Sequence, residues 1–327
     1  MERLLIPLLI LLAGCNEPPY RFHGGAVFGT SYRVKYASPV DLRDSIVAAL
    51  ARVDSSLSLF NERSLLARFN RGEEIPPDSL LSRVIRAALL AHDRTGGAFD
   101  VTVAPLVNAW GFGPEAPRVP SPRQVDSLLQ FVGSKRIALR DGRLVREREE
   151  VRVDAGAIAK GLGVDEVASA LERQGVEHYL VEVGGEVRVR GHSDARDCWW
   201  IGVLDPLETE RDGRQVTRLI IAANRGSLAT SGNYRNFRER DGQRYGHTID
   251  PRTGYPVQRD LLSASVFAGT CMEADAYATA FMVMGFEESR RLVEESPRLE
   301  ACLLYLDSEG ALQTWLSKGF QEMIARE

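Results

Sequence analysis

The sequence predicts an α+β fold in which antiparallel sheets pack against helices. Two observations support this fold class. Strand-like segments follow one another through the second half of the chain, and only two long helical segments lie among them. In addition, Asp141-Gly142 between two short apolar runs at 137–147 is typical of a tight antiparallel hairpin.

The periodicity of apolar residues defines the individual elements. Alternation with β-branched and aromatic residues predicts a strand at 28–37, and helical spacing predicts helices at 41–58 and 77–97. The aromatic segment 98–113 contains a buried-looking acid, Asp100. The remaining elements are predicted from similar patterns: a helix from 121, helices after Asp154 and after Thr270, and strands at 149–154, 178–191, 199–206, 218–231, 261–270 and 300–307.

Composition excludes several classes of protein. The 327 residues are 44% hydrophobic and 26% charged, and the net charge is -4, which is typical of a globular protein. The charge and the lack of a basic stripe argue against nucleic acid as a partner. With five histidines and no His/Cys cluster, a zinc site is not expected. No linker interrupts 26–327, so we expect a single catalytic domain there.

The N-terminus is typical of an export signal. Arg3 precedes an apolar run from Leu4 to Leu12 that is too short to span a bilayer comfortably. Leu12-Ala13-Gly14-Cys15 resembles the bacterial lipobox, which predicts a lipoprotein signal peptide at 1–14 and lipidation of Cys15. A plain secretory signal with a chance cysteine is the alternative. Residues 15–25 are then expected to form a tether, and the protein to lie in the bacterial cell envelope, anchored to a membrane and facing the periplasm or the exterior.

Three further cysteines, Cys198, Cys271 and Cys302, would lie in an oxidising compartment. They allow at most one intrachain disulfide and leave at least one thiol over. The sequence does not determine which pair would form it.

The segment 271–285 predicts a helix that is apolar on all sides and therefore buried. Thr270 and Glu273 fit a capping box at its start. Asp275 and Thr279 are four residues apart and face the same side. A buried carboxylate requires a cation, a metal or several donors. Alternatively, Asp275 only complements the helix dipole.

Two further stretches contain candidate site residues, one for binding phosphate and one for acid–base catalysis. At 153–176, a glycine-rich loop precedes a helix, where free N–H groups and the helix dipole attract phosphate. Lys160 in the first turns favours that interpretation over a tight turn that only permits close packing. The polar segment 226–257 contains His247, a candidate acid or base, although solvated hairpins would explain its composition equally well.

The combination of Asp154, Asp275, Thr279 and Lys160 suits Mg²⁺, which usually binds through one or two carboxylates and substrate phosphates. The residues therefore suggest a Mg²⁺-assisted reaction at a phosphoanhydride, outside the cytoplasm. His247 is the first candidate for the base and Asp275 the second.

Seven motifs in order over residues 28 to 285 resemble the ApbE family, the FAD:protein FMN transferases. They are FGTSY, AFDVTVAPLV with WGFG, VDAGAIAKGLGVD, VEVGGEVRVRG, ATSGNYRNF, YGHTIDPRTGYPV and EADAYATAFMVMG. The resemblance implies an ApbE-like fold, with two lobes around a flavin cleft as an option. It also implies splitting of FAD, release of AMP, and attachment of FMN to a threonine or serine of an extracytoplasmic flavoprotein, such as a redox-pump subunit.

The resemblance also implies roles for individual residues. Mg²⁺ would be held by Asp275, Thr279 and the carbonyl of Ala157. The nucleotide would be contacted by Phe28, Phe60, Ala98, Phe99, Asp100, Asp154, Lys160, Thr248 and Ile249. Phe28 and Phe60 stand where the family often has methionine and tyrosine, and Ala278 where some members have a second carboxylate, which puts the affinities for flavin and for Mg²⁺ in doubt.

Three other functions fit parts of the sequence. One is a Mg²⁺-dependent FAD pyrophosphatase, in which water replaces the acceptor hydroxyl. Another is a lipid-anchored flavin-binding protein without turnover, which would not explain Asp275 together with Thr279. A structural lipoprotein is the third, and the ordered motifs argue against it.

Overall fold

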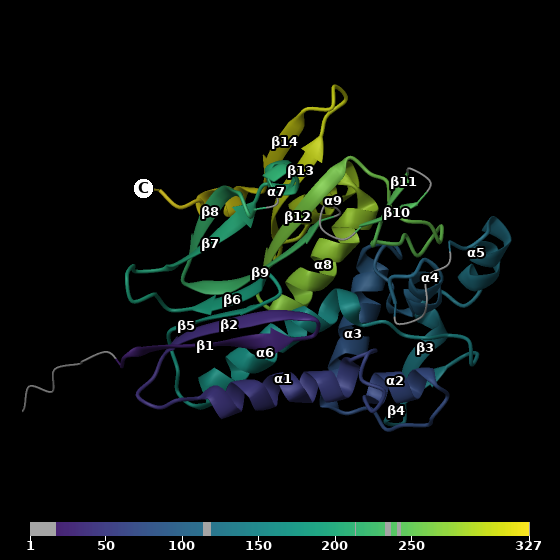
Figure 1. Cartoon of the computed structure of the whole chain (residues 1–327), viewed down its shortest axis with the longest axis horizontal. Coiled ribbons are helices and arrows are strands. Elements are labelled where there is room, and N and C mark those ends of the chain that lie inside the picture. The colour runs from purple at the N-terminus through teal and green to yellow at the C-terminus, as the bar shows by residue number, and fades with distance from the viewer. Residues whose placement is uncertain (1–17, 114–118, 213, 233–236, 241–242, 327) are drawn as a thin grey trace, which may run out of the picture.

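An eight-stranded antiparallel sheet forms the centre of the computed structural model (Figure 1). The structure describes residues 18–113, 119–212, 214–232, 237–240 and 243–326. The strands of this sheet, in spatial order, are β1 (Tyr20–Val27), β2 (Thr30–Ala37), β5 (Tyr179–Val183), β6 (Glu186–Arg190), β9 (Arg225–Gly232), β12 (Leu261–Ala268), β13 (Glu300–Leu306) and β14 (Leu312–Leu316). The predicted α+β class with antiparallel sheets is confirmed.

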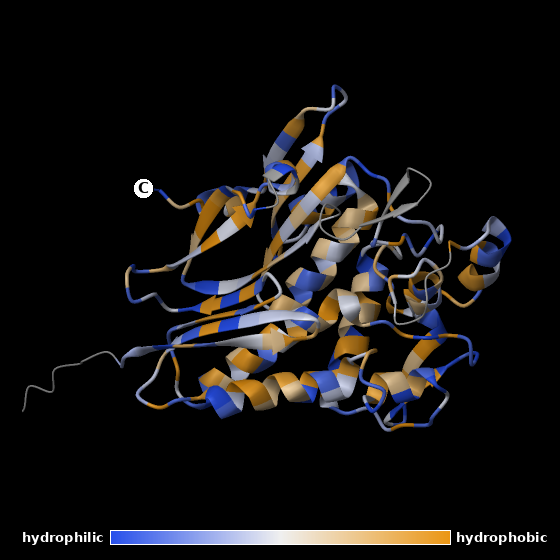
Figure 2. Ribbon diagram, viewed as in Figure 1, coloured by the Kyte–Doolittle hydropathy of each residue, from blue (hydrophilic) through white to orange (hydrophobic). Residues whose placement is uncertain are grey.

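Three long helices cover one face of the sheet: α1 (Arg43–Leu57), α6 (Gly156–Arg173) and α8 (Cys271–Met284). Part of the opposite face is covered by the hairpin of β7 (Trp199–Leu204) and β8 (Thr217–Ala223), whose Trp199 and Ile201 pack in one cluster with Val187 and Val189 of β6. The alternation of hydrophilic and hydrophobic residues along β6 can be followed in Figure 2. The two faces of the strand thus meet different partners.

The segment between α1 and α6 adds further elements beside these three helices. They are α2 (Leu65–Asn70), α3 (Ser79–Arg94), the 3-10 turn η1 (Val101–Val103), α4 (Ala104–Ala109), α5 (Pro122–Leu129), the 3-10 turn η2 (Ser134–Arg136) and the hairpin of β3 (Ile137–Arg140) and β4 (Arg143–Arg146). The largest core cluster takes side chains from this segment and from α6, α8 and the sheet. Elsewhere lie α7 (Pro206–Asp212), β10 (Phe237–Arg240), β11 (Gln243–Gly246), α9 (Phe286–Glu295) and α10 (Lys318–Glu322).

Helix α8 is buried as predicted, with Phe281 fully inaccessible and Asp275 only 2% exposed. The hydroxyl of Thr270 accepts the N–H of Glu273 at 3.2 Å, which is one half of the predicted capping box. Glu273 does not complete the box within the described chain, and its carboxylate lies 3.7 Å from Arg298 instead. In the part of the chain that the structure describes, no helix has the length and the apolar character that a membrane crossing would need.

Two predictions of local structure are wrong. Residues 20–25 are not a tether, because Tyr20–Val27 pairs along its whole length with β2. Gly24 and Gly25 weaken the strand pattern, yet a Cβ on Gly25 would lie 2.9 Å from the ring of Tyr32, so the ring requires a glycine there. Residues 1–17, including the expected signal peptide and Cys15, lie outside the described residues.

The expected strand at 149–154 does not form either, and residues 151–155 have no regular secondary structure. Val151 and Val153 are fully buried, which explains the strand-like pattern. The side-chain amide of Asn70 replaces a strand partner, since it donates to the carbonyl of Val153 at 2.8 Å and accepts its N–H at 2.9 Å.

Candidate functional site

A cavity of about 570 Å³ lies at the N-terminal end of α6, beside α8, η1, α4 and the segment 247–251. Most of the predicted site residues line this one cavity, although they come from distant parts of the sequence. Those residues are Ala98, Phe99, Asp100, Asp154, Ala157, Lys160, His247, Thr248, Ile249, Asp275 and Thr279. The structure therefore brings the glycine-rich loop, the buried helix and the histidine segment together.

Phe28 and Phe60, which the resemblance places around the nucleotide, do not line this cavity. Phe28 lies at the β1–β2 turn with φ of 50°, and its ring lies against α6, where a Cβ on Gly163 would be 2.9 Å from it. There it lines a second cavity of about 470 Å³ between this hairpin and α1. Phe60 follows the end of α1 and is 78% exposed. The structure thus does not bring these two side chains to the cavity wall with the other predicted site residues.

The backbones of α6 and α8 come into contact at Gly161. Its N–H donates to Oδ2 of Asp275 at 2.9 Å. A Cβ on Gly161 would lie 2.3 Å from the carbonyl oxygen of Cys271 and 2.8 Å from Cβ of Asp275, so only glycine fits. One turn along α8, Oγ1 of Thr279 lies 3.2 Å from the hydroxyl of Ser231 in β9. This crossing directs the carboxylate and the hydroxyl towards the same cavity.

Lys160 is held by a residue that sequence reasoning did not single out. Its Nζ lies 2.5 Å from Oε1 of Glu186, which is 2% exposed and begins β6. Gly184 and Gly185, with φ of 63° and 107°, form the tight turn that precedes it. The signal in the sequence was an acid directly after two glycines, at the start of a strand, within a stretch quoted above only for its resemblance.

Burial and mutual charge shift the protonation of this group of residues. Burial raises the pKa of Asp275, and the charge of Lys160 together with the N–H of Gly161 opposes that rise. Burial and the nearby Asp275 raise the pKa of Glu186 to about 7, against the opposing charge of Lys160. Burial alone would lower the pKa of Lys160, but Asp275 and Glu186 hold it above its ordinary value. Lys160 is therefore a permanent cation at the cavity wall.

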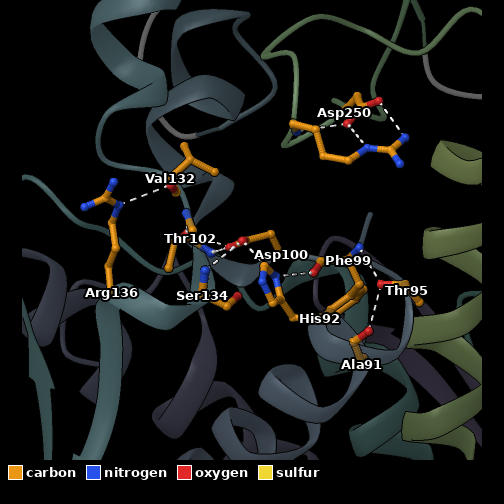
Figure 3. A network of polar contacts seen from close by, with 12 residues as sticks. Ala91, His92, Thr95, Phe99, Asp100, Thr102, Val132, Ser134, Arg136 and Asp250 are labelled. Carbon is orange, nitrogen blue, oxygen red and sulfur yellow. Dashed lines mark hydrogen bonds and ion pairs between the residues drawn. The ribbon is translucent and has the colours of Figure 1, made fainter. Parts of the chain in front are cut away.

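Asp100 is buried, and both oxygen atoms of its carboxylate bond to other groups of the protein (Figure 3). One oxygen accepts the N–H of Thr102 at 2.7 Å and its hydroxyl at 2.5 Å, and the other accepts the N–H of Ser134 at 2.7 Å and lies 3.1 Å from Nδ1 of His92. Burial pushes the pKa of Asp100 up, but these bonds outweigh it and leave the pKa lowered. Asp100 thus fixes the loop that presents Ala98 and Phe99 to the cavity.

At the start of α6, Asp154 is anchored through its backbone and side chain. Its N–H donates to the carbonyl of Val101 at 2.6 Å, and its Oδ1 accepts the N–H of Gly156 at 2.7 Å. Burial raises the pKa of this carboxyl, and the bond from Gly156 opposes the rise. Asp154 therefore connects the η1 loop to the first turn of α6, at the edge of the cavity.

The segment that carries His247, Thr248 and Ile249 is fixed by the turn that follows it. Asp250 is buried and accepts two hydrogen bonds of 3.0 Å from the guanidinium of Arg252. The indole N–H of Trp110 donates to the carbonyl of Gly254 at 2.8 Å. This anchoring holds half-buried His247 at the cavity wall.

The oxygen atoms at the cavity suit a hard divalent cation. Asp275 supplies a carboxylate, Thr279 a hydroxyl and Ala157 a backbone carbonyl, and all three residues line the same space. Among the described residues, no group of three or more His, Cys, Asp or Glu side chains could hold a metal without further ligands. Mg²⁺ commonly takes only one or two carboxylates and completes its shell with water and phosphate, so this donor set fits it. Cys198, Cys271 and Cys302 are all free thiols.

Comparison with known proteins identifies the family to which the motifs around this cavity belong. The ApbE family model matches residues 28–303, which is most of the chain. The chain belongs to the ApbE family. Two ApbE relatives, each named FAD:protein FMN transferase, come from Vibrio cholerae, with 36% identity over 97% of both chains, and from Escherichia coli K12, with 30% identity over 99% of this chain and 97% of the relative.

Solved ApbE structures share the fold. The flavin transferase ApbE from Vibrio cholerae matches with a TM-score of 0.84 and 34% identity, over 93% of this chain and 99% of that one. The apo form of the Pseudomonas stutzeri flavinyl transferase ApbE gives 0.83 and 30%, over 95% and 98%. The fold predicted from the resemblance is therefore shown.

Proposed function

We propose that this ApbE-family chain is a Mg²⁺-dependent FAD:protein FMN transferase that attaches FMN to a threonine or serine of an extracytoplasmic flavoprotein and releases AMP. One observation carries the proposal. A cation, Lys160, and the oxygen ligands of Asp275 and Thr279 line one cavity with the N-terminal turn of α6. The names of the relatives support the same activity.

The residues of the cavity can bind and orient a dinucleotide diphosphate. The ammonium of Lys160 and the N-terminal end of α6 both attract phosphate oxygens. Asp275, Thr279 and the carbonyl of Ala157 would hold the Mg²⁺ ion. When bound, the ion supplies charge neutralisation and alignment of the diphosphate oxygens. Ala98, Phe99, Thr248 and Ile249 provide the wall against which the rest of the nucleotide packs.

The proposed transfer exchanges one phosphorus–oxygen bond for another. The acceptor hydroxyl forms a bond to the phosphorus of the FMN half, and the bond from that phosphorus to the bridging oxygen breaks, so that AMP leaves with the electron pair. The hydroxyl proton goes to a base. His247 is our first candidate because it lies at the cavity wall and histidine is the side chain most often used as a general base, and Asp275 is the second.

The proposed setting is the bacterial cell envelope. The support is the apolar run ending in Leu12-Ala13-Gly14-Cys15, which would place a lipid on Cys15 and leave a short link before β1 at Tyr20. The acceptor would then be a membrane-associated flavoprotein subunit of the redox-pump type. Incorporation of labelled palmitate into the protein, and its loss in C15S, would test the anchor.

The direct test of the function is an incubation of the purified chain with FAD, Mg²⁺ and a candidate acceptor domain. We expect AMP in solution and an acceptor whose mass has increased by one FMN phosphoester. An acceptor of unchanged mass, with FAD converted to free FMN and AMP at the same rate whether the acceptor is present or not, would contradict a transferase and identify a pyrophosphatase instead. FAD that stays intact for hours would contradict both enzymes.

A further inference from the structure

The Glu186 side chain has an environment that a purely structural role does not explain. The carboxylate is almost completely buried, and among the described residues its Oε2 atom has no hydrogen-bond partner. A buried polar atom without a partner typically costs about 1–3 kcal/mol of folding free energy. Its other oxygen, Oε1, pairs with Nζ of Lys160, a residue that lines the candidate cavity.

In the part of the chain that the structure describes, Lys160 forms an ion pair with one of the two acids near it. The ion pair is with Glu186, whose Oε1 lies 2.5 Å from Nζ of Lys160. Among the described residues, no ion pair within 4.0 Å joins Lys160 to Asp275. The two groups are nevertheless close, because Gly161, the residue after Lys160, donates its N–H to Asp275 and both side chains line the same cavity. Lysine has a flexible four-carbon side chain, so its ammonium could turn to either acid.

The backbone fixes the acids in different places. Asp275 is fixed by the N–H of Gly161, on the α8 side of α6. Glu186 begins β6, directly after the turn at Gly184 and Gly185, and a Cβ added to Gly184 would lie 3.4 Å from both Oε2 of Glu186 and Cδ of Lys160. Lys160 is thus drawn towards the sheet, away from the carboxylate that faces the cavity.

From this arrangement we infer that Glu186 is a positioning residue: it holds the ammonium of Lys160 off Asp275 and so leaves the Asp275 carboxylate available to a divalent cation. This inference rests on the proposed function. Without Glu186, the ammonium would turn to Asp275 and compete with the cation for the same oxygen atoms. Substitution of a residue that orients the surroundings of a metal ligand, without touching the metal, commonly changes metal affinity by about 10–100-fold.

The test measures cation binding directly, with Mn²⁺ alone as the probe and without FAD. Titration of the full chain, followed by the electron paramagnetic resonance signal of free Mn²⁺, should show affinity about tenfold weaker for E186Q than for wild type. E186D keeps the charge and should recover part of the loss. E182Q is the matched control, since Glu182 lies in the same hairpin, is buried, and pairs with Arg33 instead of Lys160. It should bind Mn²⁺ within about twofold of wild type, because no ligand is disturbed.

A K160M variant distinguishes the positioning of Lys160 by Glu186 from a direct effect of the Glu186 charge on the cation. In K160M no ammonium can move, so adding E186Q should weaken Mn²⁺ binding by less than about threefold. Equal losses in the wild-type and K160M backgrounds would contradict the positioning role, as would unchanged affinity in folded E186Q. If the wild-type protein itself bound no Mn²⁺, the cation site of the proposed function would fail, which is a different result from failure of the inference alone.

Discussion

The backbone N–H of Gly161 in α6 donates a 2.9 Å hydrogen bond to Oδ2 of Asp275 in α8, which lies 114 residues further along the chain. This bond positions the only carboxylate among the proposed metal ligands. It also explains how a helix that is apolar on all sides keeps a buried acid: the helix backbone of α6, and not only a cation, satisfies one of its oxygen atoms.

Replacement of Gly161 by alanine should disrupt this helix crossing. Alanine gains roughly 0.5–1 kcal/mol in helix propensity. However, its Cβ would lie 2.3 Å from the Cys271 carbonyl, and a backbone atom cannot move aside as a side chain can. We expect a net loss of about 2 kcal/mol in the free energy of unfolding, measured in urea, together with loss of FMN transfer.

Gly269→Ala is the matched control for this substitution, because a Cβ at Gly269 would meet no atom within 4 Å. It should leave stability within about 0.5 kcal/mol of wild type. If G161A were as stable and as active as G269A, the close helix contact would not be what positions Asp275.

The pair of His92 and Asp100 should make stability depend on pH. The bond to Asp100 raises the pKa of His92 above its ordinary 6.5, so this stabilisation is complete below pH 6.5 and is lost as pH rises through the raised value. The lowered pKa of Asp100 gives stabilisation that is present above pH 3.8 and is lost as pH falls through the lowered value. The pair of His92 and Asp100 therefore contributes most to the free energy of unfolding between pH 3.8 and pH 6.5.

The variant H92Q tests this window by chemical denaturation at several pH values. We expect it to be destabilised by about 1–2 kcal/mol near pH 5.5, where the imidazolium bonds to a charged acceptor, and by less at pH 9, where the histidine is neutral. A deficit that is the same at both pH values would show that the charge of His92 does not contribute.

His247→Ala should separate binding from transfer. The imidazole is our first candidate for the base, and loss of a general base commonly lowers the rate by about 10²–10⁴-fold. FAD affinity, measured by flavin fluorescence, should stay within a few-fold of wild type, since the remaining wall of the cavity is intact. Transfer at the normal rate would exclude His247 as the base and leave Asp275 as the candidate.

The fold class and most of the residues at the cavity wall could be predicted from the sequence. The fold class follows from local patterns, and the cavity residues follow from the order of the motifs. Buried helix α8 and the hairpin at Asp141-Gly142 follow from periodicity and turn chemistry. The failures have long-range causes. Asn70 replaces the strand partner that Val153 would need, the ring of Phe28 packs on α6, and Glu186 reaches Lys160 from another element. None of these contacts leaves a periodic signal in one segment.

Asp275→Asn tests the central claim most directly. Asparagine keeps the size of the side chain and can still accept the N–H of Gly161, but it loses the charge that a divalent cation requires. With FAD, Mg²⁺ and an acceptor, mass spectrometry should show FMN transfer reduced by at least about 100-fold while circular dichroism shows an unchanged fold. Undiminished flavinylation by D275N would contradict the account.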